Sequence, residues 1–297
     1  MSSDSRLWVG LAVYTLTAVG TVAMLATAIV RHRDAPPGPV HLAAPVVAEP
    51  EVPPASPFVL RVCADPHDLP YSNERGEGFE NALAELVAGD LGREVRYVWQ
   101  PQRRGFIRTT LRNGSCDVVM SVPAGLERLR TTRPYYRSTY VFLARRGRAR
   151  IRSLDDPVLR HLRIGVQVIG EDYENPPPVQ ALANRHLAAN VRGYTVYGNY
   201  GATAPQRGLI DAVASGEVDV GIAWGPLAGY FAGQSTTPLA VVAIPPVAAQ
   251  ERLPFTFEMA MGVRRDDVAL ARALDEVIER READIRRILQ RFGVPLA

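Results

Sequence analysis

From Phe58 onward, short apolar strand patterns alternate with amphipathic helical patterns, and this alternation restricts the fold more than any other feature. The first strand patterns lie at residues 58–64, 95–99 and 117–122, and the helical patterns between them lie at 81–91 and 107–112. Gly92 and Gly114 close the two helical patterns, as glycine commonly does. Strands that alternate with helices at this spacing predict an α/β fold with a doubly wound, mostly parallel sheet.

The same pattern then returns at an offset of 102 positions. Residues 60–62 (LRV) correspond to 162–164 (LRI), and residues 114–118 (GSCDV) correspond to 216–220 (GEVDV). Two matches at one offset predict two similarly built α/β lobes. Because ligands of open α/β sheets bind beyond the carboxyl ends of the strands, two facing lobes would form one cleft. Four segments are expected to form the bottom of this cleft, beginning at Asp65, Ser121, Gln167 and Trp224.

Two strand patterns predict how the lobes are connected. The chain crosses over near residues 140–145 and returns near 255–263, before a charged, amphipathic helical region at 267–292. Two crossing strands are the connectivity of a two-lobed clamp. We therefore expect lobe 1 to comprise residues 58–144 plus 255–297, and lobe 2 to comprise residues 145–254.

The N-terminal region predicts attachment to a membrane. Residues 7–30 are free of charged side chains and long enough to span a bilayer, which favours an uncleaved anchor over residues 1–33. A cleaved signal peptide is the alternative, with residues 26–28 (ATA) imitating a cleavage site. Residues 34–57 are rich in Pro and Ala and predict an extended tether. Arg31 and Arg33 outnumber Arg6, so the positive-inside rule alone favours a cytoplasmic domain.

Composition excludes several kinds of chemistry. The chain has no Lys, so it can form no lysine Schiff base and has no Walker-type phosphate lysine. The net charge of +3 is too small to indicate nucleic-acid binding. No nucleophile elbow or Gly-rich nucleotide loop is visible, so no cofactor is expected and a binding protein is favoured over an enzyme. An enzyme on this fold would need a perturbed cleft carboxylate such as Glu80 or Glu258.

Motifs throughout the folded region resemble a known family. Residues 65–72 (DPHDLPYS) followed by 78–80 (GFE) are similar to the opening of type II periplasmic solute-binding proteins. More specifically, the chain resembles the subfamily linked to quinoprotein alcohol dehydrogenases, the J proteins of methanol-oxidation gene clusters. The motifs that carry the resemblance are LRVCADP (60–66), GFEN (78–81), PQRRGF (101–106), CDVV (116–119), PYYRSTYVF (134–142), VDVGIAWGPLAGYF (218–231) and FGVP (292–295). The resemblance implies two doubly wound lobes joined by two hinge strands, here preceded by one transmembrane helix.

The resemblance also implies where a ligand would be held. In amino-acid-binding members an Arg after the third strand holds the ligand carboxylate, and Arg128 is the nearest candidate. An Asp at the end of a second-lobe strand holds the ammonium group in those members, but here Trp224 follows that strand, which disfavours a free amino acid. Trp224 either stacks on a planar ligand or a peptide side chain, or packs at a lobe edge. The other residues expected at the ligand are Asp65, Tyr71, Glu80, Ser121 and Gln167.

Two further groups of residues are open to a functional or a structural interpretation. Arg103 and Arg104 open a helix and either contact an anion at the cleft rim or form a solvated helix start. Tyr135, Tyr136 and Tyr140 approach the first crossover and either face the cleft or pack beside the hinge. The acidic residues between 65 and 80 lack the spacing of a Ca²⁺ loop, and the five His are scattered, so no metal site is expected.

Two functions of different classes follow from the resemblance. The first is an accessory factor of a periplasmic PQQ-dependent alcohol (methanol) dehydrogenase system, with the dehydrogenase or its cytochrome as partner and a protein segment or a small ligand in the cleft. The second is a membrane-tethered receptor of an ABC importer for a small organic ligand that is not an amino acid. The resemblance places the folded domain in the periplasm, anchored to the inner membrane through residues 7–30.

The two cysteines, Cys63 and Cys116, are expected to remain unbonded although the periplasm is oxidising. Cys63 lies near the carboxyl end of the first strand and Cys116 just before the third. With Asp65 roughly level with Ser121, Cys63 is expected about four strand residues along from Cys116, or about 13 Å away at about 3.3 Å per residue. A disulfide requires Cα atoms within about 7 Å. The alternative is a bend that brings Cys116 back beneath the first strand.

Overall fold

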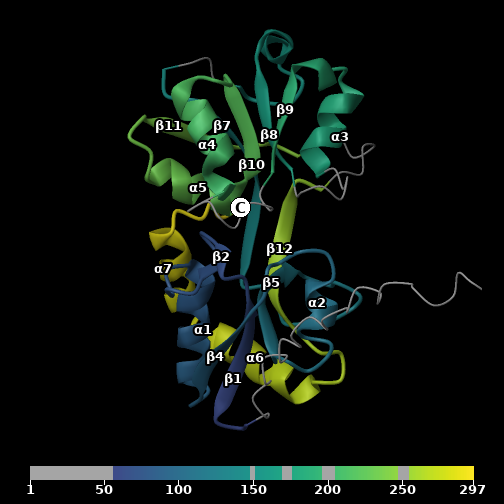
Figure 1. Cartoon of the computed structure of the whole chain (residues 1–297), viewed down its shortest axis with the longest axis vertical. Helices are drawn as coiled ribbons and strands as arrows, with labels where there is room; N and C mark the ends of the chain where they lie inside the picture. The colour runs from purple at the N-terminus through teal and green to yellow at the C-terminus, as the bar shows by residue number, and fades with distance from the viewer. Residues whose placement is uncertain (1–55, 148–150, 169–175, 196–204, 247–253) are drawn as a thin grey trace, which may run out of the picture. The chain divides into compact units, whose positions relative to one another are not determined.

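The computed structural model describes residues 56–147, 151–168, 176–195, 205–246 and 254–297 (Figure 1). These residues all belong to the second of two compact units, residues 52–297, into which the chain divides. No helix in this described part is long and apolar enough to cross a membrane. The expected anchor and nearly all of the expected tether lie outside the described residues, so both stay predictions.

Lobe 1 is the group of elements built around strand β1. Its strands are β1 (Val59–Ala64), β4 (Glu94–Trp99), β5 (Val118–Pro123), β6 (Arg130–Thr131) and β12 (Thr256–Val263), with a hairpin of β2 (His67–Asp68) and β3 (Ser72–Asn73). Its helices are α1 (Phe79–Asp90), α2 (Phe106–Thr109), α6 (Val268–Arg280) and α7 (Glu282–Arg291). The helix expected at 107–112 is shorter, because the chain leaves the α-helical pattern after Thr110, where the N–H of Arg112 donates to the carbonyl of Ile107 five residues back at 2.9 Å.

Lobe 2 is the corresponding group around strand β8. Its strands are β8 (Ile164–Val168), β9 (Val191–Thr195), β10 (Val220–Trp224) and β11 (Leu239–Ala243). Its helices are α3 (Pro177–Asn184), α4 (Gly208–Ser215) and α5 (Gly225–Gly233), with short 3₁₀ turns η1 (Pro157–His161), η2 (Ala188–Asn190) and η3 (Pro205–Arg207). In lobe 1, β4, β1 and β5 are parallel, and in lobe 2, β9, β8 and β10 are parallel. The expected α/β class with two similarly built lobes is therefore observed.

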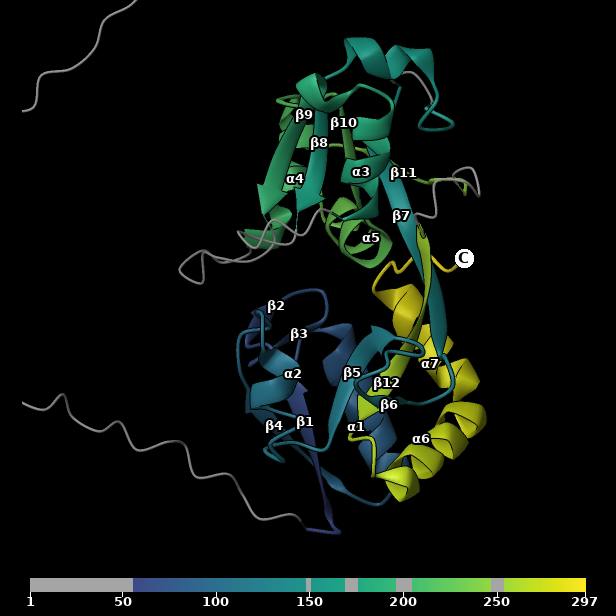
Figure 2. The same ribbon diagram turned by 90° about the vertical axis from the view of Figure 1, so that its right-hand side faces the viewer.

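Helices cover both faces of each sheet, as a doubly wound fold requires. In lobe 1, α1, α6 and α7 bury Leu83, Leu274 and Leu289 against one face, while Phe106 of α2 belongs to a separate cluster on the other. Figure 2 shows α2 on the opposite side of the lobe 1 sheet from α6 and α7. In lobe 2, Leu182 of α3 and Leu209 of α4 likewise belong to separate clusters.

Strand β7 (Tyr136–Arg145) connects the two lobes. Its first residues, 136–139, pair with β12, and its later residues, 140–144, pair with β10. Phe255, next to the start of β12, packs in a lobe 2 cluster, whereas Met261 near its end packs in the lobe 1 core. Both strands thus run between the lobes (Figure 1), as expected for hinge strands. The residue limits proposed for the two lobes stay a prediction.

One arginine–aspartate fork occurs in both lobes at the offset of 102 positions seen in the sequence. In lobe 1 the guanidinium of Arg61 donates to both carboxylate oxygens of Asp117, at 3.0 and 2.7 Å, and its backbone N–H donates at 3.1 Å. In lobe 2 Arg163 makes the same three bonds to Asp219 at 3.0, 2.9 and 3.0 Å. Each fork pins the start of one strand to the turn before its parallel neighbour, which fixes their register.

Cys63 and Cys116 form a disulfide with Cα atoms 5.5 Å apart, so the expectation of two free thiols is wrong. The expected register is not the cause of the error, because Cys63 pairs with Val119. The error lies in extending β5 backward as a straight strand. β5 begins only at Val118, and Cys116 lies in the preceding turn, which passes beneath β1 and joins Cys63 in one buried cluster with Phe106. The bend left open as the alternative is the one that occurs.

The two forks differ in burial, which gives a matched pair of stability predictions. The Arg61 and Asp117 side chains are 5% and 13% exposed, whereas the Arg163 side chain is 60% exposed. Asp117→Asn leaves Arg61 buried without its charge partner and is expected to lower the free energy of unfolding by about 3–5 kcal/mol. Asp219→Asn is the control, with a much smaller loss because exposed pairs contribute little. Equal losses in urea melts of the two variants would contradict this account.

The same pair predicts a pH dependence. Burial alone would raise the pKa of Asp117, but the hydrogen bonds and charge of Arg61 outweigh burial and lower it below the usual 3.8. A carboxyl with a lowered pKa stabilises the fold above its unfolded pKa and loses this contribution as the pH falls through its folded pKa. The difference between wild type and Asp117→Asn should therefore be full at pH 6 and shrink below pH 4.

The disulfide can be tested by mass and by stability. Alkylation without reductant should add no label to the wild type and two labels after reduction, while the single variant Cys116→Ala should take one label without reductant. The bridge closes a loop with a sequence separation of 53 residues. In the chain-entropy model, the double variant Cys63→Ala, Cys116→Ala therefore loses up to about 4 kcal/mol. Two labels on the unreduced wild type would contradict the bond.

Candidate functional site

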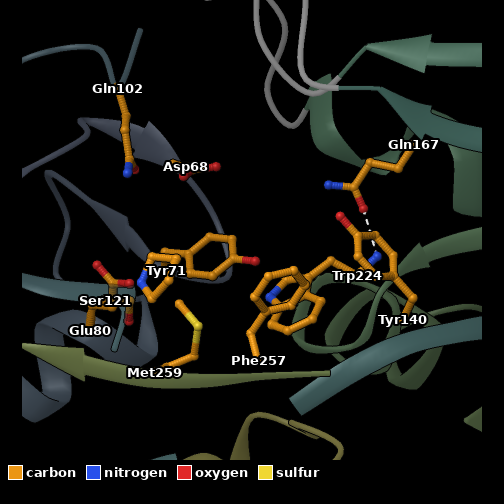
Figure 3. A pocket seen from close by; sticks show the side chains of 11 residues that line it. Asp68, Tyr71, Glu80, Gln102, Ser121, Tyr140, Gln167, Trp224, Phe257 and Met259 are labelled. Atoms are coloured by element: carbon orange, nitrogen blue, oxygen red, sulfur yellow. Dashed lines mark hydrogen bonds between the residues drawn. The ribbon is translucent and has the colours of Figure 1, made fainter. Parts of the chain in front are cut away.

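A cavity of about 320 Å³ lies between the lobes, where the carboxyl ends of strands from both sheets meet. Glu80 and Ser121 belong to lobe 1, Gln167 and Trp224 belong to lobe 2, and Phe257 lies on β12 between them (Figure 3). The described residues that line it are Asp68, Tyr71, Glu80, Gln102, Ser121, Pro123, Tyr140, Gln167, Trp224, Phe257 and Met259. This place is the one predicted by the rule for open α/β sheets.

The first turn of α1 is held against the loop that follows β1, which positions Glu80 and Tyr71 on the same wall. The backbone N–H of Glu80 donates to the carbonyl of Tyr71 at 2.8 Å, and the side chain of Asn81 accepts from the N–H groups of Asn73 and Gly78 at 3.1 and 3.0 Å. A β-carbon at Gly78 would collide with the Tyr71 carbonyl, so the Gly of the GFE motif allows this close approach.

The lobe 1 end of the cavity is acidic. Burial raises the pKa of Glu80 from 4.5 to about 7, with the charge of Asp65 adding to the increase and a hydrogen bond from Ser121 opposing it. Burial also raises the pKa of Asp68 well above 3.8, and the charges of Asp65 and Glu80 act in the same direction. None of the described residues that line the cavity is basic.

The lobe 2 end of the cavity is aromatic. The side-chain oxygen of Gln167, at the end of β8, accepts from the backbone N–H of Trp224 at 2.9 Å. This bond ties the carboxyl ends of β8 and β10 together at the cleft. The Trp224 ring contacts Tyr140 and Phe257 with ring centroids 5.3 and 5.6 Å away, both edge to face. These three side chains form one aromatic wall (Figure 3), which we call the aromatic wall below.

A buried contact joins the lobes beside the cavity. The side-chain N–H group of Gln206, in η3 of lobe 2, donates to the carbonyl of His67 at 2.7 Å and to the carboxylate of Asp68 at 3.2 Å. Leu69, the next residue of this lobe 1 loop, packs against the lobe 2 cluster that contains Leu209. We call the contacts of Gln206 with His67 and Asp68 the Gln206 bridge; they hold the two lobes together on one side of the cleft.

Five of the residues expected at the ligand line the cavity, namely Tyr71, Glu80, Ser121, Gln167 and Trp224. Asp65 is buried behind the wall, where its carboxylate accepts from the backbone N–H groups of His67 at 2.8 Å and Gln102 at 2.6 Å. Asp65 therefore ties the hairpin that carries Asp68 to the segment after β4 that carries Gln102.

The remaining expected residues lie elsewhere. Arg103 and Arg104 are exposed and do not line the cavity. Tyr135 lies behind Ser121 and donates to the Met120 carbonyl at 2.7 Å. Tyr136 packs in the lobe 1 core, where its ring meets Phe79 edge to face, and its hydroxyl has no hydrogen-bond partner among the described residues.

Arg128 is not at the cleft and cannot hold a ligand carboxylate there. It is exposed and borders a separate surface depression together with Arg112, Arg264 and Arg265. The reason is the path of the loop after β5, which leads into β6, and β6 pairs with Gly262 and Val263 at the end of β12 that lies in lobe 1. The carboxylate-binding role that the resemblance implied for Arg128 is therefore wrong for this chain.

Sequence reasoning missed part of the site. Phe257 and Met259 alternate along β12 and point to the same face, so their period of two was a usable signal. Tyr140, for which a cleft position and a packing role were both open, does line the cavity. Asp68 lies in the two-residue strand β2 and Gln102 lies in a loop, and neither segment is long enough to show a period. No three His, Cys, Asp or Glu side chains within the described ranges are grouped closely enough to hold a metal ion.

Comparison with known proteins shows similarity over both lobes. Residues 60–294 match the bacterial extracellular solute-binding proteins, family 3. The chain is similar to protein MoxJ of Methylorubrum extorquens, with 33% identity over 253 residues that cover 80% of this chain and 81% of MoxJ.

Two crystal structures share the fold. The periplasmic binding protein XoxJ from Methylobacterium extorquens AM1 is 35% identical and has a TM-score of 0.66, covering 80% of this chain and 99% of XoxJ. MxaJ from Methlophaga aminisulfidivorans MPT is 27% identical, with a TM-score of 0.71 and coverage of 80% and 100%. The periplasmic binding protein fold expected from the sequence motifs is thereby confirmed.

The Gln206 bridge predicts how the cleft opens. Gln206→Ala removes two hydrogen bonds, one of them to a carboxylate, at a cost of about 1.5–3 kcal/mol to the closed arrangement. The variant should show a larger radius of gyration in small-angle X-ray scattering and the same fold by circular dichroism. Gln180→Ala is the control, since Gln180 is exposed and bonds only to Asn184 of its own helix. An unchanged radius of gyration for Gln206→Ala would contradict the bridge.

Proposed function

Because the chain belongs to the bacterial extracellular solute-binding proteins, family 3, we propose that it is a periplasmic accessory factor of a PQQ-dependent alcohol dehydrogenase system. In this role it assembles, activates or docks the dehydrogenase or its cytochrome. The cleft holds a segment of a partner protein or a small ligand. The chain binds and does not catalyse.

One observation carries this proposal. The chain aligns with almost the full length of XoxJ and MxaJ, and it is more similar in sequence to XoxJ, at 35%, than to the amino-acid-binding proteins of the same fold, at 20% or 21%. The cleft supports the distinction, because Trp224 occupies the place of the ammonium-binding Asp and Arg128 is absent from the cavity lining. A receptor for free amino acids needs both contacts.

We further propose that residues 7–30 anchor the chain to the inner membrane, with the folded part in the periplasm. This segment lies outside the described residues, and its support is its charge-free length. An anchor keeps an accessory factor near a membrane-associated electron-transfer system.

An importer receptor is the second candidate. The observation in its favour is the small interlobe cavity closed on one side by the Gln206 bridge, which suits a clamp for a small molecule. A receptor of this kind would associate with a permease and an ATPase rather than with a dehydrogenase.

Affinity capture from washed membranes separates the two candidates. The full chain, tagged at its C-terminus, should co-purify with a quinoprotein dehydrogenase or its cytochrome, and deletion of the gene should abolish alcohol oxidation. Complementation with the full chain restores oxidation and serves as the control. Capture of a permease and ATPase, together with unchanged alcohol oxidation in the deletion strain, would overturn the proposal in favour of the importer.

A further inference from the structure

The charge distribution around the cavity is one-sided. Glu80 and Asp68 line it, and neither forms an ion pair with any Arg or His among the described residues. Carboxylates placed in a cleft of low polarity without a counter-ion raise the free energy of the empty state. A positively charged ligand would supply the missing charge at this wall.

The opposite wall suits the same ligand. Trp224, Tyr140 and Phe257 form the aromatic wall, and Tyr71 adds a further ring beside Glu80 (Figure 3). The faces of aromatic rings attract cations within about 6 Å of their centroids, and Trp does so most strongly. A ligand with a positive group and an aliphatic part can contact the rings and a carboxylate together.

The cavity also restricts what else the ligand carries. The described residues that line it include no basic side chain, so a carboxylate or phosphate on the ligand would find no charged partner among them. Its volume of about 320 Å³ is at the lower end of the range for small-molecule sites. A short alkyl chain that ends in an ammonium group fits these limits, and so does a single side chain of that kind.

We propose that the cleft binds an organic ammonium group without a neighbouring anion, with Glu80 as its counter-ion and the aromatic wall as its cation–π surface. The group comes from a free primary or methylated amine or from a lysine side chain in a segment of a partner protein. This inference rests on the proposed function as a binding protein and names the chemistry that its cleft recognises.

The raised pKa of Glu80, about 7, gives a second way to detect binding of an ammonium group. An ammonium ligand pairs with the ionised carboxylate, so its binding should release a proton from Glu80 near neutral pH. The titratable groups that face Glu80 are Asp65 and Asp68 from the loop after β1, Tyr97 from β4, and Tyr135 and Tyr136 at the start of β7. The pKa values of the three tyrosines are raised, so their hydroxyls stay protonated below pH 8 and do not contribute.

Calorimetric titration of the full chain in detergent tests the proposal with n-butylammonium as the probe and 1-butanol as its neutral counterpart. The cation should bind and the alcohol should not. Between pH 6 and pH 8 the affinity for the cation should rise about tenfold as Glu80 ionises. Equal binding of the alcohol, or an affinity for the cation that does not change with pH, would overturn the proposal.

Variants assign the effect to the named residues. Glu80→Gln should weaken n-butylammonium binding roughly tenfold or more and flatten its pH dependence, even though Asp68 is still present. Trp224→Leu should weaken it roughly three- to thirtyfold. Glu85→Gln is the matched control, since Glu85 lies exposed on the same helix. An unchanged affinity in Glu80→Gln would contradict the proposal, and the pH series on the wild type decides the matter if that variant does not fold.

Two further probes distinguish the sources of the ammonium group. N-acetyl-L-lysine N-methylamide represents a lysine within a protein segment, and tighter binding of this probe than of n-butylammonium indicates a partner's lysine, whereas the reverse indicates a free amine. L-lysine should bind more weakly than the capped form, because its free carboxylate finds no basic partner; tighter binding of L-lysine would contradict the proposal. If the chain captures a dehydrogenase but binds no amine, this inference is wrong and the accessory role stands. If it binds the amine but captures no dehydrogenase, the accessory role is wrong and this inference stands.

Discussion

The arginine–aspartate fork that recurs in both lobes is the interaction on which the arrangement of the molecule depends. Arg61 with Asp117 and Arg163 with Asp219 each tie the start of a central strand to the turn before its parallel neighbour. The fork fixes register at one end of the sheet, and the carboxyl ends of the strands then come level at the other. That alignment brings Ser121, Gln167 and Trp224 to the cavity, although the forks lie at the opposite end of each sheet.

Two connections of different strength join the lobes at the cleft: the paired strand β7 and the Gln206 bridge. Strand β7 belongs to both lobes through continuous backbone pairing, so the lobes can rotate about it but cannot separate. The Gln206 bridge consists of two hydrogen bonds, whose combined free energy is of the order that a bound ligand can offset. A carboxylate at Glu80 on one lobe and the Trp224 ring on the other make the closed cleft chemically asymmetric, and this asymmetry, more than its size, selects the ligand.

Much of the fold could be predicted because it depends on periodic patterns and repeated motifs. The two lobes, the hinge strands and the cleft position of Trp224 follow from strand patterns, strand ends and the offset repeat, whereas Glu80 was expected from the resemblance of its GFE motif. The disulfide and Arg128 could not be predicted, since each depends on the path of an irregular segment. The turn at Cys116 doubles back beneath β1, and the loop after β5 carries Arg128 away from the cleft. Residues such as Asp68 and Gln102 reach the cavity through bonds to Asp65 and Gln206 that no sequence pattern reports.

The central claim is that both lobes contribute to one binding site, and hydrogen–deuterium exchange with and without n-butylammonium tests it most directly. The account predicts that the ligand slows exchange simultaneously in the segment around Glu80 in lobe 1 and in the segment around Trp224 in lobe 2. It also predicts no change near the remote depression around Arg128. Slowed exchange confined to one lobe, or centred on Arg128, would contradict the account.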